Sequence, residues 1–575
     1  MEQQRAVLRE RCHREIVFPN NSDTIEPRFL RSDYVLTEVE ASQMKILLDA
    51  EQLALAKYRK EVARLPTATD DMEKRMTELE EVIKRRHAAV SAQRRVPIEL
   101  WQKIFNLIAH SSTKGGYSLK VHEFDQAKWK WQRPTLILSR VCSLWRRVAL
   151  DTPSLWASIS LDLSNAPGIA PWKLLGLYLQ NSKQYPLRIQ ISDGHWARGC
   201  PRHIEDCWNT LLPHLHRCRS LDADDLSSRL VIPEGSFPNL TNLSERGHEK
   251  LYWHVALQDT PKLTQVASDF LYPLSQLPYH QLTSLAFEFL VYDNIHTLVQ
   301  DVLPNCGKLE SLTFKDLEDD DSTEESESHP LVDIRSLRSL SIYVTRECVG
   351  GPLEVSSPIL SAVLALRAPA LSNLRLTFSD PGHVERWPGS LSQFCSQNST
   401  SLRTLSLSII HFDTVPLHPN LVSLLQLTRN VIKLDIVLDS YPRNKSETSQ
   451  YHSFLQQLLR HLFSGIQAER PLLPHLEDIS ITVMDSMLLC EQLVDTVLDA
   501  VHSRFSEASS VGGGASLLTE VRLVCVKTTS FDGRWERFSL SPGAAERIQG
   551  LLRHGVRVDI GEGGGGGGGG GNWFF

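Results

Sequence analysis

The feature that most constrains the fold of this chain is a short apolar pattern, Leu-x-x-Leu-x-Leu with conservative replacements, which recurs along its C-terminal half. The copies are Leu282, Leu285, Phe287; Leu309, Leu312, Phe314; Leu337, Leu340, Ile342; Leu371, Leu374, Leu376; Leu402, Leu405, Leu407; Val431, Leu434, Ile436; Leu476, Ile479, Ile481; and Leu518, Val521, Leu523. Their middle residues follow one another at intervals of about 27 to 45 residues. This recurrence predicts one repeated structural unit.

Helix-compatible segments lie between the copies, for example at residues 294–303, 454–463 and 491–505. Each unit therefore reads as one strand and one helix, and residues 158–163 and 187–192 read as earlier strands. A single unit of this kind cannot bury its own apolar face, but stacking the units buries it and produces a solenoid. We expect an α/β solenoid over residues 159–560.

The repeats resemble leucine-rich repeats, in a degenerate form that lacks the consensus Asn or Cys of the strand. The resemblance implies that the leucines point inward, so that alternate residues line a concave sheet surface: Ser311, Thr313, Lys315; Ser339, Ser341, Tyr343; Asn373, Arg375, Thr377; Thr404, Ser406, Ser408; and Lys433, Asp435. Interface hot spots favour Tyr and Arg. Tyr343 and Arg375 are therefore the main candidate substrate contacts, with Lys315 and Lys433 beside them.

Short helices are predicted ahead of the repeats, over residues 94–158. The first places Pro97 at its start, with Leu100, Ile104 and Ile108 on one face and Trp101 and Phe105 on a second apolar stripe.

The second predicted helix, residues 138–149, carries Leu138, Val141, Cys142 and Trp145 on one side. Thr152-Pro153 begins a third helix, with Thr152 as its N-cap. Three helices this short bury too little surface to be robust alone, so a partner is expected.

This region resembles an F-box. The matching residues are Val96-Pro97-Ile98-Glu99-Leu100, Ile104-Phe105, Leu138, Val141-Cys142, Trp145-Arg146 and Leu155-Trp156. The departures are Val96 in place of Leu and an inserted loop from His110 to Arg133. An ordinary three-helix subdomain remains the alternative.

The flanking residues are similar to the F-box proteins abundant in mushroom-forming fungi, because a heptad-like hairpin leads into Arg94-Arg95-Val96-Pro97 and the tail begins Thr152-Pro153-Ser154-Leu155-Trp156. The resemblance implies docking on a small Skp-type adaptor that links to a cullin ubiquitin ligase. The implied adaptor-binding residues are Val96, Pro97, Leu100, Ile104, Phe105, Leu138, Val141, Cys142 and Trp145.

Residues 1–32 show no sustained period and are predicted to be a flexible lead-in. Residues 33–93 carry heptad-like spacing in two segments, interrupted at Glu51 and Arg86 and separated at Pro66, with a capping-box-like start at residues 67–70. We expect an antiparallel helical hairpin. It either mediates dimerisation or acts as a spacer, or it closes on itself or packs on the following helices.

The composition of the chain limits the classes of partner and the cellular compartment that can be expected. The net charge of −7 argues against a general polyanion-binding field, and hence against nucleic acid. The ten cysteines form no CxxC pair, which favours a reducing compartment, and no signal peptide or membrane-spanning stretch is evident. A cytoplasmic or nuclear location away from membranes follows. The clusters Lys84-Arg85-Arg86 and Arg94-Arg95 fit a solvated helical face better than a nuclear import signal.

The remaining clusters carry little chemistry. The histidines and cysteines from His195 to Cys218 match no zinc-ligand spacing. The acidic stretch 316–327 reads as a solvated loop, or alternatively as a phosphorylatable docking loop. Residues 561–575 read as a glycine-rich tail. No catalytic constellation or cofactor site stands out, so an enzyme is disfavoured.

The expected function is therefore that of a substrate-recruiting F-box subunit of a cullin-type (SCF) ubiquitin ligase, which binds the adaptor through the F-box and a protein substrate through the repeats. The alternative is an F-box interaction scaffold that acts without ubiquitination.

Overall fold

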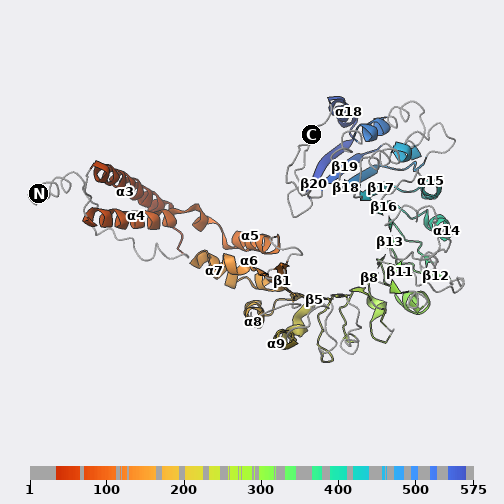
Figure 1. Ribbon diagram of the computed structural model, residues 1–575, viewed down its shortest axis with the longest axis horizontal. Helices are drawn as coiled ribbons and strands as arrows, with labels where there is room; N and C mark the ends of the chain where they lie inside the picture. Colours follow the sequence, from red (N-terminus) through yellow and green to blue (C-terminus); the bar gives the residue numbers. More distant parts are fainter. Residues whose placement is uncertain are drawn as a thin grey trace, which may run out of the picture. The chain divides into compact units, whose positions relative to one another are not determined.

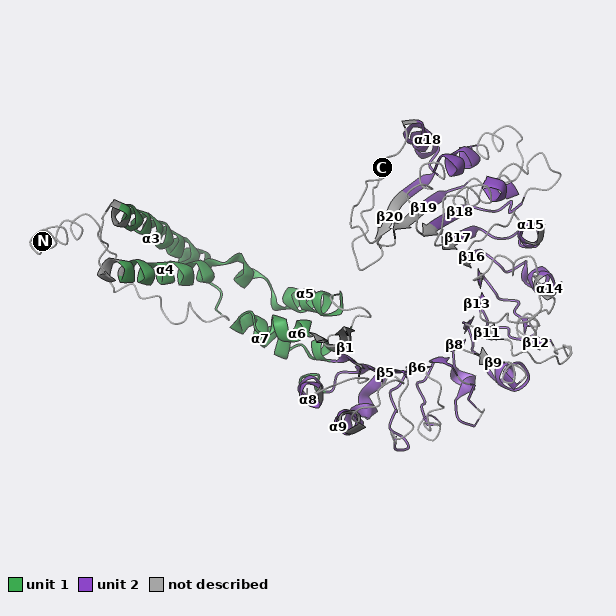
Figure 2. Cartoon of the chain, viewed as in Figure 1, with its two compact units in different colours: residues 1–119, 132–156, 181–183 green, residues 120–131, 157–180, 184–575 purple. Residues whose placement is uncertain are grey.

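The structure is a computed structural model of the 575-residue chain. It describes residues 34–64, 70–111, 117, 119–125, 128–162, 171–192, 201–224, 232–246, 257, 259–269, 271–272, 275–287, 290–291, 297–315, 317–318, 331–344, 366–378, 389–410, 419–439, 456–459, 461–462, 472–484, 494–502, 518–527 and 542–564. The chain divides into two compact units (Figure 2). Unit 1 comprises residues 1–119, 132–156 and 181–183, and unit 2 the remainder. The predicted lead-in, residues 1–32, lies outside the described residues.

Unit 1 begins with two long helices, α3 (Glu38–Arg64) and α4 (Asp70–Val90), which pack against each other (Figure 1). Helix α3 starts later than the predicted residue 33 because Thr37 and Glu40 form a capping box. The Glu40 carboxylate accepts from the Thr37 backbone N–H at 2.9 Å, and the Glu40 N–H donates to the Thr37 hydroxyl at 3.3 Å. The predicted start of α4, residues 67–70, falls largely outside the described residues.

The hairpin core is formed by Ala54, Leu55, Tyr58, Leu79 and Ile83, so the two helices close on each other. The two heptad positions that break the apolar pattern, Glu51 and Arg86, lie opposite each other in this interface. Their side chains form an ion pair at 2.7 Å with only 3% of each exposed. The charged residue that interrupts the apolar pattern of α3 is therefore neutralised by the one that interrupts the pattern of α4.

The three-helix region contains η1 (Ala92–Arg95), α5 (Ile98–Ser111), α6 (Pro134–Leu138), α7 (Ser143–Leu150) and η2 (Pro153–Trp156). The prediction of one helix over residues 138–149 was wrong, because Cys142 is extended and caps α7, its sulfur accepting from the Trp145 N–H. Thr152 directly precedes η2 as predicted, and its carbonyl accepts from the Leu155 N–H at 3.1 Å. Its hydroxyl does not cap the turn, because it donates backward to the Val148 carbonyl at 2.7 Å.

Unit 2 contains one long sheet. Its strand order is β2-β1-β3-β4-β5-β6-β7-β8-β10-β13-β15-β16-β17-β18-β19-β20, and the pairs from β3 to β20 are parallel. The strands are β1 (Leu119–Asp125), β2 (Lys128–Gln132), β3 (Ser158–Asp162), β4 (Leu187–Ser192), β5 (Cys218–Asp224), β6 (Asn242–Arg246), β7 (Gln265–Ser268), β8 (Ser284–Phe287), β10 (Ser311–Phe314), β13 (Ser339–Val344), β15 (Asn373–Phe378), β16 (Thr404–Ile410), β17 (Lys433–Asp439), β18 (Asp478–Met484), β19 (Glu520–Lys527) and β20 (Arg557–Gly564). Two short parallel pairs accompany it: β9 (Leu290–Val291) with β11 (Leu317–Glu318), and β12 (Val332–Asp333) with β14 (Leu366–Arg367).

The register explains the recurring apolar pattern. The middle residue of each copy pairs with the middle residue of the next copy, as Leu312 does with Leu340 and Leu340 with Leu374. This buried row continues beyond the copies found in the sequence, to Ile159 at one end and Val558 at the other. The mixed α/β class and the stacked parallel repeats are thus confirmed, with the core on the leucine side of the sheet.

Helices and helical turns connect the strands: α8 (Pro171–Asn181), α9 (Pro201–Leu211), η3 (Leu212–Arg217), η4 (Tyr279–Gln281), η5 (Leu298–Val302), η6 (Leu303–Asn305), α14 (Gly389–Asn398), α15 (Pro419–Leu427) and α18 (Pro542–Arg553). Residues 494–502 are also helical, within the predicted segment 491–505. Within the predicted helix over residues 294–303, the described residues form a π-helical turn at Leu298–Val302 followed by a 3₁₀ turn at Leu303–Asn305, and residues 294–296 lie outside the described part of the chain. Strand β20 continues past the predicted start of the tail at residue 561.

The predicted inserted loop from His110 to Arg133 was wrong in part. It contains β1 and β2, which extend the sheet beyond β3. The chain therefore leaves unit 1 for unit 2 through these strands and returns to unit 1 at Gln132.

Buried polar side chains close the turns that lead into the strands. Asn398, at the end of α14, donates to the Phe394 carbonyl at 2.8 Å and accepts from the Ala368 N–H at 3.1 Å, which links two successive repeats. Thr260 and Thr428 similarly donate to carbonyls of the turn before them. The strands lack the consensus Asn or Cys of a leucine-rich repeat. Asn398, Thr260 and Thr428 nevertheless provide buried side-chain hydrogen bonds to the backbone of these turns.

We expect Asn398→Ala to destabilise this part of the sheet by about 1–3 kcal/mol, because the buried Ala368 N–H would lose its acceptor. Hydrogen exchange of peptides covering β14 to β16 measures the effect. Ser396→Ala, on the exposed side of the same helix, is the control and should change little. Equal exchange in both variants would show that Asn398 does not carry the link.

Candidate interaction surfaces

The three-helix region is held by a cluster of three aromatic rings. The ring centroids of Trp101 and Phe105 lie 5.7 Å apart, and Trp145 lies 5.1 Å from Trp101 and 5.0 Å from Phe105. The buried Trp156 indole donates to the Ala149 carbonyl at 2.7 Å. Tilted and edge-on contacts of this kind are favourable for aromatic rings. The second apolar stripe of α5 is therefore the internal core of this region.

The first stripe of α5 faces outward. Leu100 is 47% exposed and Ile104 39%, and Leu107 is exposed further still. We define the aliphatic face as the following exposed side chains of this region: Leu100, Ile104, Leu107 and Ile108 on α5, and Ile137 and Val141 at the end of α6 and in the turn after it. Scattered exposed aliphatics are common, but several on one short helix indicate an interaction surface.

The predicted adaptor-binding residues divide between this face and the core. Leu100, Ile104 and Val141 are exposed apolar residues, and Pro97 and Cys142 are also exposed. Val96 is half-buried. Phe105 and Leu138 are buried and Trp145 is half-buried in the ring cluster, so these three support the surface from within.

Sequence reasoning missed Leu107 and Ile137, both strongly exposed. The signal for Leu107 was present, because it lies two turns after Leu100 on the same side of α5. Pro97 also differs by one position from its predicted place: its carbonyl accepts from the N–H groups of Leu100 and Trp101, which makes it the cap that precedes α5.

The second surface is the polar face of the sheet in unit 2, opposite the buried row. Register places its residues in lines across the strands. Ser311, Ser339, Asn373, Thr404 and Lys433 form one line, and Thr313, Ser341, Arg375, Ser406 and Asp435 form the next. Tyr343 pairs with Thr377 further along. Lys315 follows the last residue of β10 and is half-buried.

Arg375, Ser406 and Asp435 are consecutive in the second line, on three adjacent strands. Parallel strands are about 4.8 Å apart, so this arrangement holds the backbones of Arg375 and Asp435 about 10 Å apart with Ser406 between them. Burial raises the pKa of the Asp435 carboxyl, and the charges of Lys433 and Arg375 oppose that rise. The Ser406 hydroxyl is buried and has no hydrogen-bond partner among the described residues.

Charged residues continue toward the C-terminal edge of the sheet. Lys433 lies 3.8 Å from Asp435, and Arg522 contacts Glu520 at 3.0 Å and Asp559 at 3.4 Å. At the other end the polar face is occupied by a hydrogen-bonded chain, in which Ser160 donates to Gln190 and Gln190 donates to Asp222. Side chains that already hydrogen-bond one another have fewer donors and acceptors left for a partner protein. The strands from β13 to β17 are therefore a better candidate contact surface than β3 to β5.

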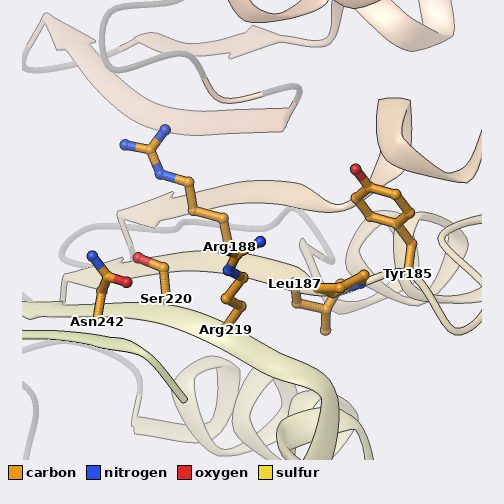
Figure 3. Close-up of a pocket in the computed structure, with 7 residues that line it drawn as sticks. Tyr185, Leu187, Arg188, Arg219, Ser220 and Asn242 are labelled. Carbon is orange, nitrogen blue, oxygen red and sulfur yellow. The ribbon is translucent and has the colours of Figure 1, made fainter. Parts of the chain in front are cut away.

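A shallow hollow of about 370 Å³ lies where β4, β5 and β6 begin, lined by Tyr185, Pro186, Leu187, Arg188, Arg219, Ser220 and Asn242 (Figure 3). A register shift between β4 and β5 leaves Arg219 as an extra residue, which brings a second arginine beside Arg188.

The histidines and cysteines between His195 and Cys218 were predicted not to bind zinc. Cys207 and Cys218 are buried, and burial raises the pKa of each thiol to about 12. Among the described residues no group of three or more potential ligands gathers. His195 and Cys200 lie outside the described residues. In the described part of the chain, no helix has both the length and the apolar character needed to cross a membrane.

Comparison with known proteins finds distant structural similarity. No family model matches the chain, and no curated protein gives a significant match. Among solved structures, the leucine-rich repeat-containing protein LegL7 from Legionella pneumophila is similar at 12% identity and a TM-score of 0.31, covering 68% of this chain and 97% of that one. The strand register of this chain itself shows the stacked parallel repeats.

Proposed function

We propose that the three-helix region is an F-box and that the chain is the substrate-recruiting subunit of a cullin-type ubiquitin ligase. The single observation that carries the proposal is the aliphatic face: the motif residues Leu100, Ile104 and Val141 are exposed while Trp101, Phe105 and Leu138 form the core beneath them. In this proposal a small Skp-type adaptor covers the exposed face.

The energetics support a partner on this face. Burying one large aliphatic side chain contributes about 1.5–3 kcal/mol, so covering several of them on α5 and α6 can offset the cost of association. The side chains are held by a packed aromatic cluster rather than by loops. A preformed surface loses less conformational freedom on binding, which favours a stable complex.

The repeats supply the second surface. We assign the polar face between β13 and β17 to a protein substrate, with Tyr343, Arg375 and Lys433 as contacts and Asp435 beside them. Catalysis would come from the ligase, not from this chain, and action in the cytoplasm or nucleus follows from that assembly.

Copurification of the full chain from cells tests the assignment. Recovery of a Skp-type adaptor together with a cullin supports the ligase subunit. Recovery of the adaptor without a cullin supports the second candidate, an interaction scaffold that uses the same aliphatic face without ubiquitination. Recovery of neither contradicts the F-box assignment.

We expect Tyr343→Ala combined with Arg375→Ala to remove one or more copurifying proteins while adaptor recovery stays unchanged, because the two surfaces belong to different units. Losing a Tyr and an Arg contact costs about 2 kcal/mol or more each when they are hot spots. Quantitative mass spectrometry of the copurified proteins measures the change.

The control is Arg335→Ala, which removes an exposed arginine after β12, outside the polar lines. It should leave the recovered proteins unchanged. If the double variant recovers the same proteins as the parent, the substrate site lies elsewhere. If a folded double variant loses the adaptor, the separation of the two surfaces is contradicted.

A further inference from the structure

Helix α3 has a second apolar line on the side opposite the hairpin core. Val39, Ile46 and Leu53 recur at every seventh residue and are 67%, 69% and 60% exposed. The core-facing residues Ala41, Met44, Leu48 and Leu55 follow their own heptad. In that heptad the three exposed residues occupy the position furthest from the core, where soluble hairpins carry polar residues.

Helix α4 provides an internal comparison. The equivalent outward positions on α4 are Lys74, Glu81 and Ala88, two charged residues and a small one. An apolar outward line is therefore specific to α3 and is not a general property of the hairpin. The line holds one apolar residue per heptad over two full heptads, which makes a narrow exposed apolar stripe that a second helix can cover.

We propose that this outer line of α3 pairs antiparallel with the same line of a second copy of the chain, with Ile46 at the two-fold axis. In this pairing Ile46 packs on Ile46 of the other copy, and Val39 packs on its Leu53. The surface is thus self-complementary, as a two-fold interface requires.

The charges around the line select the antiparallel direction. Lys60 is the next residue in the series after Leu53. A parallel pair would place Lys60 against Lys60 at the seam, whereas an antiparallel pair carries it beyond the Val39 of the other copy. Like charges in direct apposition are destabilising.

The centre of the pairing is also charge-complementary. Lys45 and Asp49 are both exposed and lie on the same flank of Ile46. In the antiparallel arrangement this flank faces the same flank of the other copy, so Lys45 of each copy lies near Asp49 of the other. Both pairs repeat across the two-fold axis, which commits the surface to a second copy rather than to an unrelated helix.

Sedimentation velocity of the full chain over a hundredfold concentration range tests the proposal. We expect a shift from monomer to dimer, and we expect Ile46→Glu to raise the dissociation constant at least about a hundredfold, because both copies lose a buried aliphatic and gain a charge at the axis. Ala88→Glu, at the equivalent position of α4, should leave the dissociation constant unchanged. A chain that is monomeric throughout, or a dimer indifferent to Ile46→Glu, overturns the proposal.

Two further variants fix the geometry. Lys45→Asp should weaken the dimer, and adding Asp49→Lys should restore it. Under mild oxidation, a mixture of Val39→Cys and Leu53→Cys chains should form a disulfide that neither forms alone above the background of the parent chain. Cross-linking of each variant with itself instead would indicate a parallel pair and contradict the antiparallel arrangement.

Discussion

An Ile104→Asp chain is expected to lose capture of a Skp-type adaptor, with the dissociation constant rising at least about a hundredfold. Ile104 lies in the middle of the aliphatic face, between Leu100 and Leu107 on α5. The substitution removes about 1.5–3 kcal/mol of apolar burial in the complex. It also places a carboxylate in the contact without a partner, which is costly. A pull-down with purified adaptor measures the loss.

Leu331→Asp is the control. It places the same charged residue at another exposed aliphatic position, in unit 2 just before β12. It should leave adaptor capture unchanged. Because Ile104 is exposed, the Ile104→Asp chain should fold, and its tryptophan fluorescence should match that of the parent. Unchanged capture by a folded Ile104→Asp chain would remove the aliphatic face from the binding site.

The second large effect is expected in the hairpin. Arg86→Leu leaves the Glu51 carboxylate buried without its counter-ion and should destabilise the hairpin by about 3–5 kcal/mol. Adding Glu51→Leu removes the second charge, and the double variant should return to near the parent stability or exceed it.

Hydrogen exchange of peptides within residues 38–90 measures these changes, because a chain of two units need not unfold in a single transition. Arg59→Leu is the control. It breaks the ion pair between Arg59 and Glu80, which has the same 2.7 Å separation but an Arg59 side chain that is 61% exposed. Exposed pairs contribute about 1 kcal/mol or less. An equal effect of Arg59→Leu and Arg86→Leu would show that burial is not decisive.

The repeated sheet could be predicted from the sequence because its cause is periodic. Each strand needs apolar residues at the same inward positions. Leu312, Leu340 and Leu374 can therefore be recognised from the repeated pattern alone, without knowing which strands are adjacent. The earlier strands β5, β6 and β7 were harder to find. Their inward positions include Ala223, Glu245 and Ser268, which do not stand out as apolar in the chain.

Pairing between distant segments could not be predicted. Glu51 and Arg86 each look like an error in their own helix, and only the packing of α3 on α4 makes them partners. The strands β1 and β2 inside the predicted loop depend on their place beside β3 in the sheet. Alternation was visible in Lys128-Trp129-Lys130-Trp131, which is a strand signal that the loop interpretation overlooked.

The candidate site shows the same limit. The sequence identified two apolar stripes on the first helix of the three-helix region but could not decide which one faces outward. Packing decides it: Trp101 and Phe105 meet Trp145 across α5 and α7, which leaves Leu100 and Ile104 at the surface. Large aromatic rings bury more area than aliphatic side chains, so placing them inside is favoured.

We expect a Skp-type adaptor to cover the aliphatic face of α5 and α6. Hydrogen exchange of the purified full chain, with and without a purified adaptor, measures this coverage. Exchange over residues 98–111 and 134–142 should slow when the adaptor is present, and exchange in strands β13 to β17 should stay unchanged. Unaltered exchange over residues 98–111 at saturating adaptor, or slowing confined to the strands, would contradict it.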